Sequence, residues 1–121
     1  MTLRGAIIAE SLREGFALED IEFTVVGLRR IRVDAPADGQ PQVWTLLQFE
    51  AADEAADYLA SRLQDGLLTP GWYANFDQDA DLKWVVFPGK TYRYRHDDSA
   101  VHNDALAYAA QLGIPEGQRD W

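Results

Sequence analysis

The sequence predicts an α+β fold, with a mostly antiparallel sheet of about six strands and two helices on one face of that sheet. The chain has 121 residues, a usual length for one domain, so we expect a single domain over residues 1–121. Hydrophobic residues make up 47% and charged residues 26%, as in ordinary globular proteins, which argues against disorder. Short segments with period-two alternation, together with two segments of helical period, predict this class.

The first part of the chain predicts three strands. A short apolar run predicts a strand over residues 4–10, and a capping-box pattern that begins at Ser11 predicts a turn or a short helix after it. Residues 21–33 favour a strand, but the phase of their apolar positions shifts, which predicts a bulge near Gly27. Residues 42–50 alternate most clearly and carry apolar residues on both faces, which predicts a central or covered strand.

The second part predicts a helix, three strands and a second helix. An apolar stripe of helical period runs from Ala52 to Leu67. Further strands are predicted over residues 72–76, 83–87 and 91–95. The last helix is predicted over residues 99–112, with a Schellman ending at Gly113 and Ile114 before Pro115. Strand, strand, helix, strand in the middle of this order is typical of half a ferredoxin-like fold, so a variant of that fold is one option.

Charge and cysteine content restrict the partners. Eleven Lys and Arg against twenty Asp and Glu give a net charge of −9, which argues against a general nucleic-acid binder. The chain has no cysteine, which excludes disulfides and thiolate zinc sites and is typical of a reducing compartment. No apolar stretch is long enough for a signal peptide or a membrane span, so we expect a cytoplasmic protein that is not bound to a membrane.

Half of the aromatic residues lie between residues 72 and 94, which favours either an aromatic-lined cleft or subunit interface, or simply the core of a small sheet. The sequence Pro88-Gly89 predicts a type II turn, which would pair Phe87 with Lys90 and Trp84 with Arg93. Because a ring beside a guanidinium is typical of an accessible surface, Trp84 is the main candidate for a partly exposed anchor. The candidate ligand or interface residues are Trp72, Tyr73, Trp84, Tyr92, Arg93 and Tyr94.

Two histidines and nearby carboxylates form a second candidate group. His96, Asp98 and His102 could hold a metal through two imidazoles and a carboxylate. The alternative is that an aspartate caps the last helix while both histidines are solvated, which fits better because a helix must begin there. We therefore expect no cofactor.

Arginines gather in two of the predicted strands. The residues are Arg29, Arg30 and Arg32 in one strand and Arg93 and Arg95 in another. If the strands were neighbours, they would form an anion-binding strip; singly, such residues discourage aggregation at a sheet edge. Nucleic-acid binding through this strip is the weaker interpretation, given the net charge.

Several phrases resemble a group of small uncharacterised bacterial proteins of unknown function. They are Val43–Glu50, Gly71–Phe76, Val86–Lys90 and, most specifically, the ending Leu112–Trp121, which contains Gly-Ile-Pro-Glu-Gly-Gln-Arg-Asp-Trp. The resemblance implies a free-standing bacterial domain and no particular chemistry. The ending has a physical interpretation of its own: we expect the Trp121 indole to dock on the body of the domain. The alternative is that this indole contacts a ligand or a second subunit.

No motif of the sequence names a reaction. It contains neither a Gly-x-Ser-x-Gly nucleophile elbow nor a glycine-rich phosphate loop. We therefore expect a domain without catalytic activity that binds a small molecule or a protein partner, as a homodimer. The alternative is a small enzyme that uses a carboxylate or a histidine in an aromatic-lined cleft.

Overall fold

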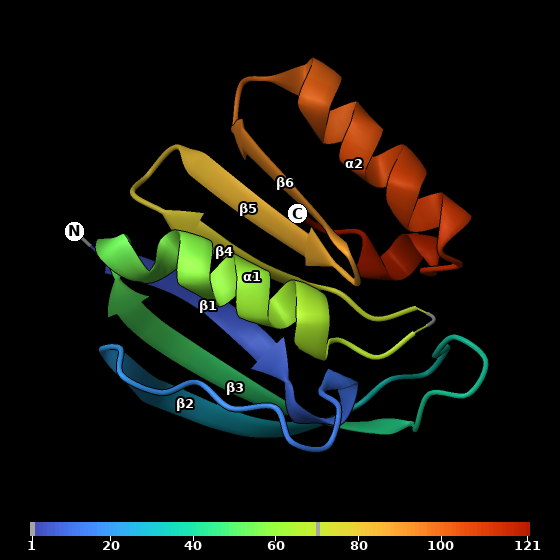
Figure 1. Cartoon of the computed structure of the whole chain (residues 1–121). Coiled ribbons are helices and arrows are strands. Elements are labelled where there is room, and N and C mark those ends of the chain that lie inside the picture. Colours follow the sequence, from blue (N-terminus) through green and yellow to red (C-terminus); the bar gives the residue numbers. More distant parts are fainter. Residues whose placement is uncertain (1, 70) are drawn as a thin grey trace.

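The computed structural model describes residues 2–69 and 71–121, and this part of the chain forms one six-stranded sheet and two α-helices (Figure 1). The strands are β1 (Thr2–Ile8), β2 (Phe23–Arg32), β3 (Val43–Ala52), β4 (Ala74–Gln78), β5 (Leu82–Phe87) and β6 (Lys90–Arg95). The helices are α1 (Ala56–Gly66) and α2 (Ser99–Gln111). There are also three short 3-10 helices in the described chain: one follows β1, one precedes α1 and one lies near the end of the chain.

The sheet has the order β2-β3-β1-β4-β5-β6, and each neighbouring pair is antiparallel. The predicted α+β class with about six strands is therefore confirmed. Strands β2, β3, β1 and β4, with α1 following β3, have the order expected of a ferredoxin-like variant without its first helix. A hairpin and α2 are added beyond β4. Neither helix is long and apolar enough to cross a membrane.

The two helices cover opposite faces of the sheet, so the prediction that both lie on one face is wrong. Consecutive residues of β5 show this: Trp84 and Val86 belong to the cluster beneath α1, whereas Val85 and Phe87 belong to the cluster beneath α2. Adjacent residues of a strand point to opposite faces, and all four are buried, so each face needs a cover. In Figure 1, α1 lies in front of the central strands, while α2 lies at the β6 side.

Local signals in the sequence located the turns well. The register of β2 on β3 shifts between Val25 and Gly27, which confirms the bulge. Phe87 pairs with Lys90 across a turn in which Gly89 has a φ of 77°, as the type II turn requires. At the end of α2, the amide of Ile114 donates to the carbonyl of Ala109, which is the long bond of a Schellman motif.

The segment after β1 has the expected turn, at Glu14 and Gly15, but not the expected capping box. Ser11 ends a 3-10 helix, and its hydroxyl donates to the Ile8 carbonyl at 2.6 Å, so it caps no following helix. The Glu10 side chain instead bonds to β3. Its carboxylate accepts from the backbone amide of Thr45 at 2.6 Å and from the Thr45 hydroxyl at 2.8 Å. The carboxylate thereby satisfies an amide of β3 that lies beyond the last residue of β1.

This contact gives a pH-dependent contribution to stability. Partial burial by itself would raise the pKa of Glu10, but the hydrogen bonds from Thr45 outweigh it and hold the pKa below its ordinary value of 4.5. A lowered pKa in the folded state means that the contribution is present above that ordinary value and is lost as the pH falls through the folded pKa.

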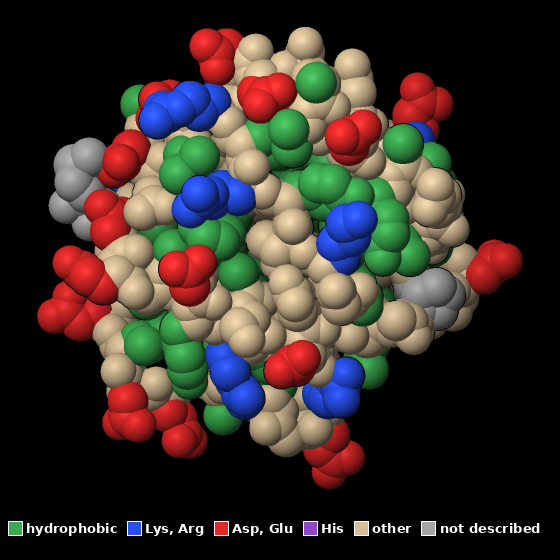
Figure 2. Space-filling view, turned by 45° about the horizontal axis from the view of Figure 1, so that its top comes forward, with side chains coloured by type: hydrophobic (Ala, Val, Ile, Leu, Met, Phe, Trp, Pro, Cys, Tyr) green, Lys and Arg blue, Asp and Glu red, His purple; other side chains and the backbone are tan. Residues whose placement is uncertain are grey.

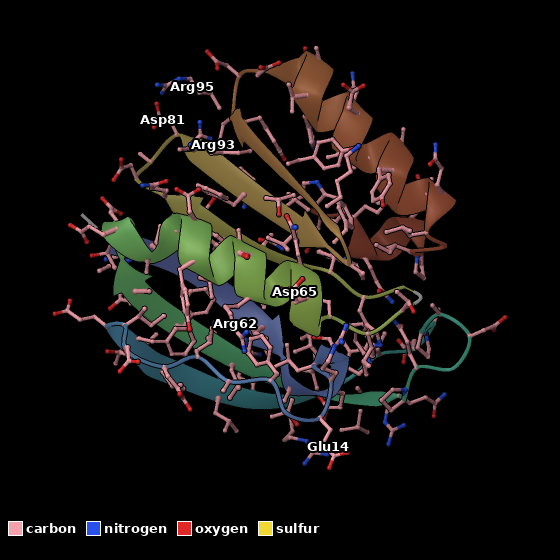
Figure 3. All side chains as sticks on the ribbon, in the orientation of Figure 1. Glu14, Arg62, Asp65, Asp81, Arg93 and Arg95 are labelled. Carbon is pink, nitrogen blue, oxygen red and sulfur yellow. The ribbon has the colours of Figure 1, made fainter. Side chains whose placement is uncertain are left out.

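We expect Glu10→Gln to lower the free energy of unfolding by about 1 kcal/mol near neutral pH, because a charged acceptor is replaced by a neutral one. In urea unfolding, the difference from the unmodified protein should shrink as the pH falls below 4.5. Glu14→Gln is the control, because Glu14 loses the same charge at an exposed position, labelled in Figure 3. A pH-independent difference would contradict the assignment.

Candidate functional site

A cleft of about 580 Å³ lies on the face of the sheet opposite α1. Its floor includes Ala6 and Ile8 of β1, Leu46 of β3 and Asn75 of β4. Ala6 pairs with Asn75 and Ile8 with Leu46, so these side chains share one face of the sheet. Their neighbours along the strands point the other way, into the core beneath α1. The cleft occupies the part of this face that α2 leaves uncovered.

The C-terminal segment forms one wall of the cleft. Gln118, Asp120 and Trp121 line it, and the Trp121 ring packs against Tyr73 at a centroid distance of 4.6 Å. The ring also meets Phe87 edge-on at 6.0 Å. The expected docking of Trp121 is therefore confirmed.

Polar bonds tie this wall to the domain. The Tyr73 hydroxyl donates to the carbonyl of Gln118, and the Nε2 atom of His102 lies 2.8 Å from the backbone oxygen of Trp121. Burial, and then the nearby Asp120 carboxylate, raise the pKa of Tyr73 above its ordinary range, so the phenol keeps its proton as a donor. The wall is thus positioned by aromatic packing and by hydrogen bonds from two sides.

A second wall lies at the end of the sheet, where Trp44 and Trp72 pack together at 5.0 Å. The indole nitrogen of Trp44 donates to the Pro41 carbonyl at 2.8 Å. Gln40 donates to the Gly71 carbonyl at 2.9 Å, which joins the loop before β3 to the segment before β4. Both indoles are almost fully buried, so they form a rigid boundary.

The charged groups of the cleft differ in exposure. Arg32 and Asp120 are exposed at its rim, while the Lys83 side chain is only 14% exposed. The Lys83 ammonium lies 2.9 Å from the Asp77 carboxylate. An ammonium has three donors, so Lys83 can bind a further acceptor without leaving Asp77.

Two donors in the tail wall are buried without a partner. Within the described residues, neither Nε2 of Gln118 nor Nε1 of Trp121 has a hydrogen-bond acceptor. A buried donor without a partner costs about 1–3 kcal/mol. Both donors belong to side chains that line the cleft.

The structure divides the predicted aromatic candidates between different places. Trp72 and Tyr73 line the cleft. Tyr92 and Tyr94 pack in the cluster beneath α2. Tyr94 stacks on His102 at 5.4 Å, and burial, followed by the charge of Asp77, raises its pKa to about 12.

Trp84 is not the exposed anchor that the sequence suggested. Its predicted neighbour is correct, because Arg93 lies over the ring at 5.4 Å. The Trp84 side chain, however, is only 5% exposed, stacks on Phe76 at 5.4 Å and donates to Gln78 at 3.0 Å. The Arg93 guanidinium therefore lies over the ring of a core residue. A guanidinium beside a ring is not evidence here that the ring is accessible.

The histidine group does not assemble into a metal site. Asp98 caps α2 by accepting from the amide of Val101, as the alternative interpretation expected. His96 lies 3.4 Å from Asp77, and His102 points to the tail. Among the described residues, no three His, Asp or Glu side chains are placed to share a metal.

His96 thus has the carboxylate neighbour that the enzyme alternative requires, but neither histidine is among the residues that line the cleft. Neither histidine is therefore placed as a base for a molecule in the cleft.

The arginine strands are not neighbours, so the anion-binding strip is wrong. Arg29, Arg30 and Arg32 lie on β2 and Arg93 and Arg95 on β6, at opposite edges of the sheet. Arg95 forms an ion pair with Asp81 at 2.6 Å, and Figure 3 shows both at the β6 side. On the face drawn in Figure 2, Lys and Arg side chains stand apart, while Asp and Glu lie mainly around the rim.

Sequence reasoning missed most of the cleft. In the sequence, Trp44 and Lys83 look like ordinary strand residues, and no pattern singles out Gln118. These positions come from segments that are far apart in the chain, so no local pattern joins them. Two signals were available: the aromatic concentration, which included Trp72 and Tyr73, and the tail, whose aromatic end predicted a docked segment.

Comparisons of the chain with family models, with curated proteins and with solved structures find no match. The resemblance to a group of small bacterial proteins therefore stays a prediction, and a function is inferred from the geometry of the cleft.

Proposed function

We propose that this domain binds a small molecule with an apolar, planar body and an anionic group, and that it does so without catalysing a reaction. The observation that carries the proposal is the cleft, whose volume of about 580 Å³ lies within the usual range of ligand sites. Its floor is apolar apart from Asn75, and only a few further polar groups line it, which is the ordinary composition of such sites.

The charge of the ligand follows from the donors. Lys83 is the most buried charged group that lines the cleft, and the unpartnered nitrogens of Gln118 and Trp121 lie in its wall. Donors without acceptors favour a ligand rich in acceptor atoms, such as a carboxylate. The rings of Trp44, Trp72 and Tyr73 favour a flat apolar body beside it. We expect this domain to act in the cytoplasm of a bacterium. The cytoplasmic location is expected because the chain lacks cysteine, which is typical of a reducing compartment.

The four tryptophans allow a test with an internal control. Trp44, Trp72 and Trp121 line the cleft, whereas Trp84 is not among the lining residues and stacks on Phe76. In ¹H–¹⁵N spectra, titration with indole-3-carboxylate should shift the three cleft indole signals and leave that of Trp84 in place. Equal shifts of all four signals, or none at millimolar ligand, would refute the site.

A matched pair of probes tests the charge. Indole-3-carboxamide has nearly the shape of the carboxylate but no charge, so it should bind about tenfold more weakly. Lys83→Met should remove that preference and leave the carboxamide affinity unchanged. If both probes bound the unmodified protein equally, the anionic part of the proposal would fail while the cleft itself would stand.

A further inference from the structure

Strand β2 carries most of the large apolar side chains that are exposed in the described part of the chain. Of the five large apolar side chains that are exposed, three lie there: Val25 is 50%, Val26 57% and Leu28 62% exposed. β2 is also one edge of the sheet, so its outer backbone groups have no strand partner among the residues that the structure describes. The other edge, β6, has no such patch, because its outward residues are charged and α2 packs beside it.

The charges around β2 are ordered along the chain. Glu19, Asp20 and Glu22 lie at its start, and Arg29, Arg30 and Arg32 at its end. All six are exposed. Scattered arginines would simply repel another edge strand. An acidic start and a basic end instead complement the β2 strand of a second copy in the antiparallel direction, because the acidic end of each strand then lies beside the basic end of the other.

We infer that β2 pairs antiparallel with β2 of a second copy of this chain, about a two-fold axis perpendicular to the sheet. Such an axis places the same face of both copies on the same side of the joined sheet. Two side chains that lie opposite each other across the pair must therefore belong to the same face. The Val25–Gly27 bulge decides which pairs satisfy this condition.

The register follows from the partners of β2 on β3. Phe23 and Leu28 pair with Ala51 and Leu47, which share a face, since they lie four residues apart in one strand. Opposing Leu28 with Phe23 of the second copy places Arg29 opposite Glu22 of that copy. Arg29 pairs with Leu46, and the Glu22 carbonyl accepts from the amide of Ala52, so these two also share a face, the other one. Both contacts occur twice in the symmetric pair.

This pairing deepens the expectation of a homodimer and does not depend on the cleft. It predicts a continuous sheet across the two copies, with an apolar centre at Val25 and Val26 and an ion pair on each side. The exposed Val25 and Val26 would then lie opposite Val26 and Val25 of the second copy, and the exposed Leu28 opposite its Phe23.

The test is the oligomeric state of charge-reversal variants, measured by sedimentation over a concentration series. The unmodified protein should form dimers. Arg29→Glu and Glu22→Arg should each weaken the dimer at least about tenfold, because like charges then face each other twice. The double variant, or an equimolar mixture of the two single variants, should restore it. Arg95→Glu, the same reversal at the other edge, should have no effect.

Two outcomes would overturn the inference. One is a monomer at hundreds of micromolar protein. The other is a dimer that Arg29→Glu leaves unchanged, which would place the interface elsewhere. Circular dichroism of each variant separates a lost dimer from a lost fold.

Discussion

Trp84→Ala should lower the free energy of unfolding by about 3–5 kcal/mol, the usual cost of removing a large buried ring. The Trp84 ring is 5% exposed and stacks on Phe76 with an interplanar angle of 16°. Its removal would leave a cavity between β4, β5 and α1, and it would also remove the hydrogen bond to Gln78. Urea unfolding, followed by circular dichroism, measures the loss.

The size of the effect distinguishes the two interpretations of this residue. A partly exposed anchor on a strand would cost about 0.5 kcal/mol or less when truncated, because surface substitutions seldom do more. Tyr58→Ala is the control, since Tyr58 lies on α1 and is 39% exposed. Trp84→Phe keeps the stacking and loses the indole hydrogen bond, so it should cost about 1–2 kcal/mol. If Trp84→Ala cost no more than Tyr58→Ala, the placement of this ring in the core would be wrong.

The case of Trp84 shows where sequence reasoning succeeded and where it failed. The turn at Pro88-Gly89 gave the correct partner, Arg93, because two-residue hairpins fix their register locally. The same reasoning could not predict which helix covers each face of the strand. Trp84 and Val85 are both buried, under different helices, and their sequence is equally compatible with one covered face and one open face.

Elements were predictable because each depends on neighbours along the chain. The helical stripe of α1, the bulge near Gly27 and the Schellman ending at Gly113 all depend on contacts within a few residues. The strand order was suggested only by the ferredoxin-like option, since β1 lies between β3 and β4 and no local signal joins Ile8 to Leu46. The cleft could not be predicted for the same reason, because it forms only when the C-terminal segment packs against the sheet.

Gly5→Ala should be the other severe change, with a loss of about 3 kcal/mol or a failure to fold, because it overpacks a rigid site. Gly5 lies in β1, between its partners Phe49 on β3 and Phe76 on β4. A Cβ atom at this position would lie 2.6 Å from the carbonyl oxygen of Asn75 and 2.6 Å from the Cβ of Phe76. Both atoms belong to a neighbouring strand or are fixed to it, so neither can rotate away.

Gly117→Ala is the matched control, because a Cβ there would meet no atom within 4 Å. It should change the free energy of unfolding by less than about 0.5 kcal/mol. A loss of less than about 1 kcal/mol for Gly5→Ala would mean that β4 can move away from β1 at little cost. A glycine inside an apolar strand is itself a signal of close backbone approach, and at Gly5 this signal was available in the sequence.

The same substitution links the sheet to the cleft. Ala6 and Asn75 line the cleft floor, and each is adjacent to one member of the Gly5–Phe76 pair. A shift of β4 that accommodates a methyl group at Gly5 must therefore displace the floor as well. If Gly5→Ala folds, it should weaken indole-3-carboxylate binding even under conditions where the variant is fully folded, whereas a binding site elsewhere on the surface would be unaffected.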